Sequence, residues 1–266
     1  MKAKKIIKGI GVFFLILLLL VGIFFAVCKI YGNKNTYIMN GTINDGLNQV
    51  KKHYNVSQLD AGEFENLRFY GIMNFHTDQY KVENLGNLSV MTADMGFMQM
   101  VSFMIVPFEK NVPMCTLDFM YIFGKRKSYV EFYDLVGDTQ TDEYKNVVKQ
   151  LSDMAAKYDD VKEIEVKENW YDKYLSVIMH KEFSGDDIDE RNDRLFQDAL
   201  STYLNAANAL PVSSEEDQKK QLDNTQEYCN GLIEKGGVST DVFKKALGAD
   251  KTHEFFDNVF FGTNHY

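Results

Sequence analysis

The stretch Val112–Leu135, which reads VPMCTLDFMYIFGKRKSYVEFYDL, decides the fold of this chain. Two runs of β-branched, aromatic and methionine residues flank a turn at Gly124, as expected for two antiparallel strands joined by a hairpin. Within the run 114–123 both faces are largely apolar. A sheet with one face in water would alternate apolar with polar residues, so the pattern predicts helices on both sides. Asp118 is the exception, a carboxylate on a surface predicted to be buried.

Similar runs elsewhere predict a mainly antiparallel sheet followed by helices. We expect a helix over 142–158, where apolar residues recur with a period of 3.6, and Ser214 and Ser239 are candidate N-caps of later helices. The pattern predicts an α+β fold with a central mainly antiparallel sheet and helices on both of its sides. The expected strands are 67–74, 88–94, 98–106, 114–123, 128–135 and 174–183, and the later helices are 186–209, 214–235, 239–247 and 251–260.

The N-terminal segment predicts one transmembrane helix. Residues 9–28 read GIGVFFLILLLLVGIFFAVC and carry no charge. At about 1.5 Å per residue they span about 30 Å, the thickness of a hydrocarbon core. A long signal peptide is the alternative, but the residues before Cys28 lack the small residue of a lipoprotein cleavage site. We therefore expect a retained single-pass anchor in the cell membrane.

The charges around this helix predict its orientation. Four lysines precede it and only Lys29 and Lys34 follow closely, which favours a cytoplasmic N-terminus and an outward-facing globular part. The residues Gly32–Asn35 read as a short linker, and Asn44 as the cap of a brief helix. The predicted division is an anchor and linker over 1–34 and one globular domain over 35–266.

Charge, cysteine and histidine exclude several functional classes. The 266 residues carry a net charge of −9, and because the first 35 residues hold six basic and no acidic residues, the remainder carries −15. This acidic balance excludes a nucleic-acid binder. The three cysteines lack close spacing and the five histidines lack zinc-ligand spacing, so we expect no disulfide framework, no metal site and no cofactor.

Asp118 is the strongest chemical candidate in the chain. Burying an ionised carboxylate costs several kcal/mol unless it is paired, and desolvation otherwise raises its pKa toward neutrality, as a general acid requires. The alternative is structural: Asp118 accepts hydrogen bonds from a loop, or pairs with Arg126 or Lys127 at the sheet edge. The methionine-rich run 91–104 is expected in the core, although methionine also suits a pocket for a flat apolar ligand.

The order of these pieces resembles the ferredoxin-dependent bilin reductases. The segments that carry the resemblance are YKVENLGNLSVMTADM, QMVSFMIVP, VPMCTLDFMYIFG and YVEFYDL, with VFKKALGADKTHEFFDNVFFG near the C-terminus. The resemblance implies a three-layer α/β/α sandwich, with a linear tetrapyrrole held between the sheet and the C-terminal helices. It also implies that this ligand is reduced with electrons from ferredoxin, without flavin or metal. It places the family's central aspartate, a proton donor, at Asp118. The residues expected beside the bilin are Met91, Ser102, Thr116 and Met120.

The chain also departs from the family pattern. Where family members carry a glutamate and two histidines, this chain has Met91, Ser89 and Ser102, and a second aspartate is replaced near Lys235. A single remaining proton donor implies a two-electron reduction at one site, or binding without turnover.

Ferredoxin is an acidic, cytoplasmic protein, so its docking calls for a local basic patch, expected at Lys125, Arg126 and Lys127. The leading hypothesis is a membrane-anchored reductase of a biliverdin-type tetrapyrrole. The alternatives are a non-catalytic tetrapyrrole-binding domain and a surface interaction domain.

Overall fold

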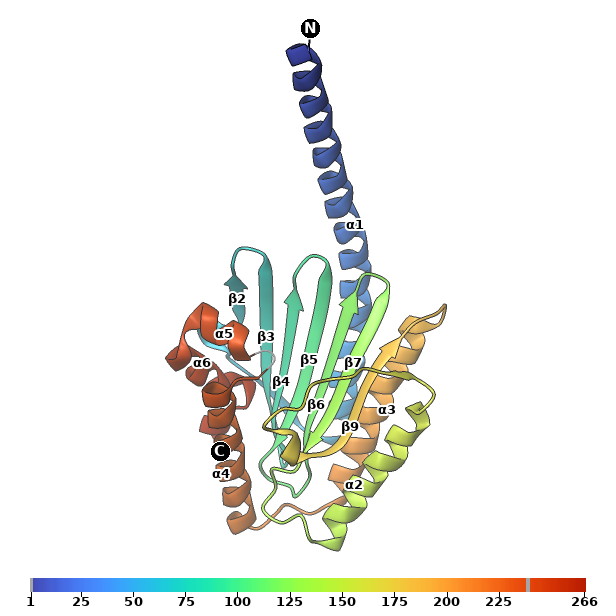
Figure 1. Ribbon diagram of the computed structural model, residues 1–266. Coiled ribbons are helices and arrows are strands. Elements are labelled where there is room, and N and C mark those ends of the chain that lie inside the picture. Colours follow the sequence, from blue (N-terminus) through green and yellow to red (C-terminus); the bar gives the residue numbers. More distant parts are fainter. Residues whose placement is uncertain (1, 238–239) are drawn as a thin grey trace.

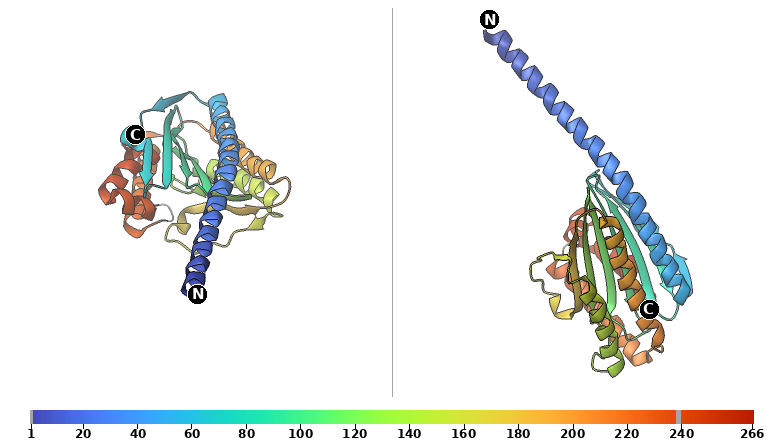
Figure 2. Two further views of the ribbon diagram at one scale, coloured as in Figure 1. Left: turned by 90° about the horizontal axis from the view of Figure 1, so that it is seen from above. Right: turned by 90° about the vertical axis from the view of Figure 1, so that its right-hand side faces the viewer.

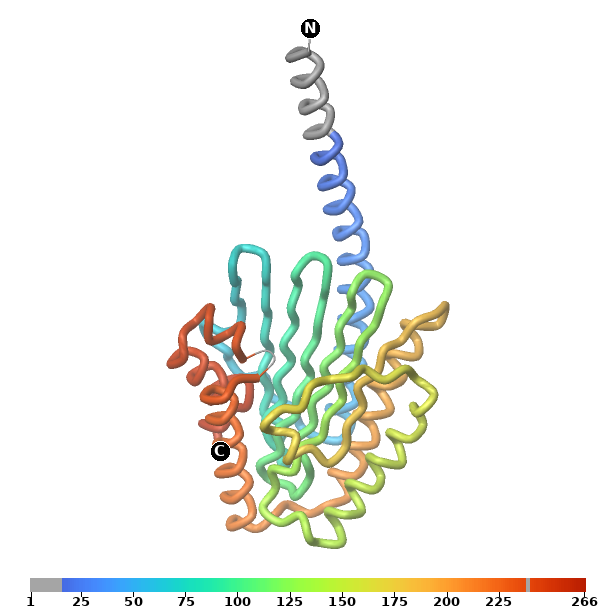
Figure 3. The backbone as a smooth tube through the Cα atoms, viewed as in Figure 1, coloured from blue at the N-terminus to red at the C-terminus, as the bar shows by residue number. Residues whose placement is uncertain are grey.

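The computed structural model describes the backbone of residues 2–237 and 240–266, and side chains from residue 16 onward within these ranges (Figure 1). Its centre is one antiparallel sheet in the order β1-β3-β4-β5-β6-β7-β9-β8, with β2 also paired to β3. Figure 3 traces the path of the backbone through these hairpins. The strands are β1 Val56–Leu59, β2 Asn66–Phe69, β3 Met73–Val82, β4 Gly86–Asp94, β5 Met98–Pro107, β6 Met114–Ile122, β7 Lys125–Tyr133, β8 Lys162–Glu163 and β9 Leu175–Phe183.

Helices cover both faces of this sheet, as the apolar pattern of β6 predicts (Figures 1 and 2). One face carries α1 (Lys2–His53), α2 (Asp142–Ala155) and α3 (Ile188–Ala209). The other carries α4 (Glu215–Lys235), α5 (Thr240–Leu247) and α6 (Ala249–Phe255), followed by a π-helical turn at Phe256–Phe260. The expected three-layer α/β/α sandwich is confirmed.

Two details of the strand prediction are wrong. The expected strand 67–74 contains a turn, because Tyr70 and Gly71 have φ angles of 53° and 73°, and the chain reverses there from β2 into β3. A positive φ breaks an extended strand, and only glycine adopts it without strain. The short strands β1 and β8 also escaped prediction.

The expected cap of α4 is confirmed. The Ser214 hydroxyl accepts a hydrogen bond from the backbone N–H of Asp217 at 3.2 Å, so it satisfies one of the free donors in the first turn. The second expected cap, Ser239, lies outside the described residues.

The predicted linker after the anchor is wrong, because α1 is one helix of 52 residues. Its second half packs on the sheet and on α3. The amide of Asn35, fully buried, donates to the Gln99 side chain at 3.1 Å and to the Phe123 carbonyl at 3.2 Å. Glycine and asparagine are poor helix formers, but these tertiary contacts offset that local preference. Asn44 is therefore an interior helix residue and not a cap, while the proposed domain division at residue 34 stays a prediction.

Candidate functional site

The candidate site lies on the sheet face that carries α4 to α6. Directly opposite residues in the antiparallel register share a face, and one row across the sheet contains Met91, Ser102, Asp118, Tyr129 and His180. The row joins β4, β5, β6, β7 and β9. Asp118 thus occupies the middle of the sheet, between a serine on one side and a tyrosine and a histidine on the other.

The five residues predicted for the site all lie on this face, on three neighbouring strands. Met91, Ser102 and Thr116 are buried, whereas Asp118 and Met120 are half-buried. Thr116 lies opposite Met104 in the next row, and Met120 lies opposite Met100 in the row nearer the hairpin ends. The strand register therefore brings the predicted residues together.

This face is rich in methionine, and we call it the methionine face. Seven of the twelve methionines of the chain project from its strands. Their flexible thioethers give a polarisable apolar surface that adapts to flat ligands. The residues are Met73, Met91, Met98, Met100, Met104, Met114 and Met120.

The carboxyl of Asp118 is shielded from solvent at one oxygen. Its Oδ1 has no hydrogen-bond partner within the part of the chain that the structure describes. Desolvation raises the pKa of Asp118 from 3.8 to about 7, the Ser102 hydroxyl and the charge of His180 oppose this shift, and the charge of Glu131 adds to it. The carboxyl therefore holds a proton over much of the range up to neutral pH.

The structural alternative for Asp118, a pair with Arg126 or Lys127, is wrong. The guanidinium of Arg126 projects to the opposite face, where its Nη2 lies 2.6 Å from the Asp189 carboxylate of α3. Lys127 lies 4.0 Å from Glu182. Arg126 is also only 1% exposed, so the predicted basic docking patch over 125–127 loses its central residue.

Two titratable side chains on the same face as Asp118 escaped prediction. A ring nitrogen of His180 lies 2.7 Å from the Glu131 carboxylate, and the Tyr133 hydroxyl donates to the other Glu131 oxygen. Glu131 was within reach of sequence reasoning, because a hairpin centred on the turn at Gly124 places it on the face of Asp118. His180 was not, because it comes from β9, which pairs with β7 only in the tertiary fold.

The C-terminal segment closes one side of the methionine face. The Ser89 hydroxyl donates to the carbonyl of Phe260 at 2.8 Å, and Phe243 of α5 packs on Phe69 and Phe75. The Ser89 hydroxyl therefore makes a structural contact. Toward the hairpin ends the face is less covered, since Met98, Met100 and Met120 stay half-buried.

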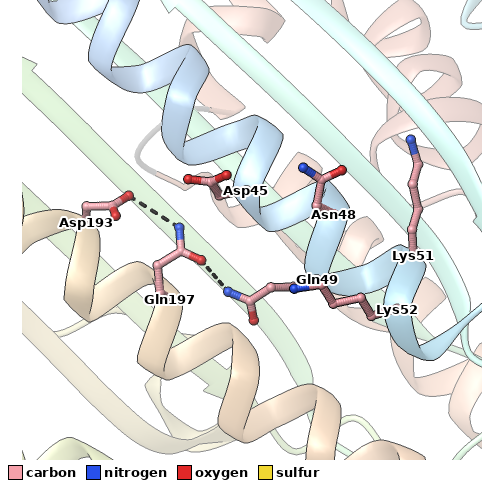
Figure 4. Close-up of a pocket in the computed structure, with 7 residues that line it drawn as sticks. All are labelled: Asp45, Asn48, Gln49, Lys51, Lys52, Asp193 and Gln197. Carbon is pink, nitrogen blue, oxygen red and sulfur yellow. Dashed lines mark hydrogen bonds between the residues drawn. The ribbon is translucent and has the colours of Figure 1, made fainter.

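A separate hollow of about 640 Å³ lies on the opposite side of the sheet, between α1 and α3 (Figure 4). The Gln197 amide donates to Asp193 at 3.3 Å and its carbonyl accepts from Gln49. None of the predicted site residues lines this hollow, which is open and lined by residues with polar or charged side chains. Its lining residues are Asp45, Asn48, Gln49, Lys51, Lys52, Asp193 and Gln197.

The arrangement on the methionine face suits proton donation beside an apolar surface. A neutral carboxylic acid at Asp118 has a proton to give, and the Glu131–His180 pair supplies a second acid–base group on the same face. Within the described ranges, no group of three or more His, Cys, Asp or Glu side chains is placed to hold a metal ion.

No protein-family model matches this chain, and no curated protein matches it. Its fold is similar to the crystal structure of phytochromobilin synthase from tomato in complex with biliverdin. The TM-score is 0.69, and the match covers 85% of this chain and 83% of the tomato chain at 14% sequence identity. The chain therefore shares the fold of this tomato protein.

Proposed function

We propose that this protein is a membrane-anchored bilin reductase-like enzyme that reduces a linear tetrapyrrole of the biliverdin type. Asp118 is the proton donor in this proposal, and Met91, Ser102, Thr116 and Met120 contact the bilin. The observation that carries the proposal is the shielded carboxyl of Asp118 on the methionine face, whose pKa lies at about 7 and whose Oδ1 has no hydrogen-bond partner among the described residues. The fold shared with a biliverdin-bound protein supports the choice of ligand.

The proposed reaction adds two electrons and two protons to one double bond of the bilin. Two reduced ferredoxins each give one electron and become oxidised. Protonated Asp118 gives one proton and becomes a carboxylate. The second proton comes from solvent by way of His180 and Glu131, which lie on the same face as Asp118. Water then reprotonates Asp118 for the next turnover.

The anchor in this proposal is α1. From Ile16 onward it contains a segment with mean hydropathy 2.1, long and apolar enough to cross a membrane, and only 6% of that segment is buried in the rest of the structure. The lysine distribution favours a cytoplasmic N-terminus, which places the globular domain outside, away from ferredoxin.

This topology, together with the loss of the basic patch at Arg126, favours a second candidate function. In it the domain binds a tetrapyrrole at the same face without reducing it. The replacement of the family's acidic and histidine positions by Met91, Ser89 and Ser102 is consistent with binding alone, since none of these side chains donates a proton near neutral pH.

A spectroscopic titration separates the candidates. The full chain in detergent micelles is mixed with biliverdin, and its absorbance is followed before and after addition of reduced ferredoxin. The enzyme hypothesis expects a shifted bilin spectrum on mixing and a second change on reduction, while binding alone gives only the first. If mixing leaves the spectrum of biliverdin unchanged, both candidates are wrong.

Variants assign the role of Asp118. Asp118→Asn is expected to retain bilin binding and to lose reduction, because the amide cannot release a proton. Asp193→Asn is the matched control, a half-buried aspartate on α3 at the opposite face. Equal turnover in the native chain and in Asp118→Asn would remove the proposed proton donor.

A protease-protection assay on intact cells tests the topology. A protected domain supports the ferredoxin-dependent reaction. A digested domain supports the non-catalytic binding candidate or an extracellular interaction domain.

A further inference from the structure

Three hairpin turns lie together at the end of the sheet from which α1 projects (Figure 1). They connect β2 to β3, β4 to β5 and β6 to β7. Large apolar or aromatic side chains are exposed on the first two: Tyr70 is 64%, Ile72 is 70% and Phe97 is 45% exposed. Hairpin tips of a protein surrounded by water are usually polar, so this clustering of apolar side chains marks a contact surface.

The contacts of α1 fix the height of these tips along the helix. The rings of Tyr31 and Phe123 meet edge to face, with their centroids 5.9 Å apart. A Cβ built on Gly32 would lie 3.4 Å from the carbonyl oxygen of Gly96, in the β4–β5 turn. Two of the three tips therefore touch α1 at residues 31 and 32.

The apolar segment of α1 ends just before this level. Its last uncharged residue, Cys28, is only 7% exposed, whereas Val27 and Ile30 beside it are exposed, so the domain begins to cover the helix at residue 28. Because α1 is continuous, the four residues from Cys28 to Gly32 advance by about 6 Å along its axis. The headgroup layer of a bilayer extends about 5–7 Å beyond the hydrocarbon core. The hairpin tips thus lie at headgroup depth when α1 crosses the membrane.

The lean of α1 brings the tips toward the bilayer. Both views of Figure 2 show residues 16–30 of α1 leaning to the side of the sheet that carries α4 to α6. Lys29 on α1 and Lys125 on the β6–β7 tip are exposed at the same level, where lysine pairs with lipid phosphate. Aromatic residues flanked by lysine are typical of the membrane interface.

We propose that the tips at 70–72, 95–97 and 123–125 form a second membrane contact, a docking surface for the phospholipid headgroups of the bilayer that α1 crosses. This inference rests on the membrane anchoring proposed above. The surface holds the domain against the bilayer in one orientation, with the methionine face turned to the membrane side. An apolar pigment dissolved in the lipid then meets that face without crossing bulk water.

Spin labelling of the full chain in nanodiscs of phosphatidylcholine and phosphatidylglycerol tests this surface. Single-cysteine substitutions Ile72→Cys and Phe97→Cys carry a nitroxide at two tips. Val212→Cys is the matched control, because Val212 is 48% exposed and lies in the segment between α3 and α4, at the opposite end of the sandwich. Leu18→Cys reports on the anchor itself. The native cysteines are buried, and the unsubstituted chain gives the background labelling.

The readout is the relaxation of each nitroxide by a water-soluble nickel complex and by oxygen, which partitions into lipid. At residues 72 and 97 we expect nickel accessibility several-fold lower than at residue 212, and higher oxygen accessibility. If both tips match residue 212 while residue 18 is shielded, docking is wrong and anchoring stands. If residue 18 is accessible to nickel, the anchoring proposal is wrong and the docking surface falls with it. Circular dichroism of each labelled chain verifies the fold.

Discussion

Replacing Asp118 by asparagine should change the pH dependence of stability by an amount that follows from the burial of its carboxyl. In the native chain the pKa of Asp118 is raised from 3.8 to about 7 because burial disfavours the charged form. Between these two values the folded chain holds a proton that the unfolded chain releases. The contribution of this group to the free energy of unfolding is therefore fully present below pH 3.8 and is lost as the pH rises toward 7.

The magnitude follows from the two pKa values. At pH 8, where both states are ionised, the buried carboxylate costs about 4 kcal/mol relative to the unfolded chain. At pH 5 the folded chain is protonated and the cost is about 1.6 kcal/mol. Asp118→Asn removes this pH-dependent cost while it keeps the size and shape of the side chain. The free energy of unfolding of Asp118→Asn minus that of the native chain should therefore increase by about 2.5 kcal/mol between pH 5 and pH 8.

Urea unfolding of the full chain in detergent micelles, followed by circular dichroism at both pH values, measures this difference. Other titrating groups cancel in the comparison of variant with native chain, apart from the two that interact with Asp118. Asp193→Asn, on the other face of the sheet, is the matched control, because it leaves the carboxyl of Asp118 in place. A constant difference between Asp118→Asn and the native chain would mean that the carboxyl is ionised and solvated throughout, and the argument for a neutral acid would fail.

Three further predictions concern single contacts. Gly46→Ala should lower the free energy of unfolding by about 1–3 kcal/mol in urea, because its Cβ would lie 2.8 Å from a buried phenylalanine ring of α3. Glu131→Gln should lower the pKa of Asp118 and His180→Ala should raise it, because the two charges act on Asp118 with opposite sign. Infrared titration of the Asp118 carboxyl measures both pKa shifts. Shifts of equal sign would contradict the assignment. Ser214→Ala should cost about 1 kcal/mol in urea through loss of the α4 cap, and Ser214→Asp should restore it.

Local patterns were enough to predict most elements of the fold. Runs of β-branched, aromatic and methionine residues bounded by turn signals located β4 to β7 and β9, and the period of 3.6 located the start of α2 and placed its end within three residues. Both signals arise within one segment, so they survive without knowledge of its neighbours. The strand expected at 67–74 failed because Tyr70 and Gly71 both adopt a positive φ, and Gly71 was the local signal of this turn that the prediction did not use.

The candidate site was only partly accessible from sequence. Alternation along β6 placed Asp118, Thr116 and Met120 on one face, and the burial of its carboxyl agrees with the expected rise in pKa. The side chains that act on that carboxyl were not predicted. Arg126 lies on the next strand, four residues before Val130. Its side chain points to the other face and binds α3. A charge that acts on Asp118 comes instead from His180, more than 60 residues further along the chain.

The sequence by itself determined that an apolar segment precedes a sheet with two apolar faces, and that one aspartate lies among the buried residues of that sheet. These properties depend on hydrophobicity and on side-chain alternation, which each segment carries alone. Only the tertiary structure decided that α1 continues unbroken through Gly32 and Asn35, and that His180 lies on the face of Asp118. The physical reason is that contacts between distant segments supply the free energy for both, against weak local preference in α1 and without any local signal of which strand β9 pairs with.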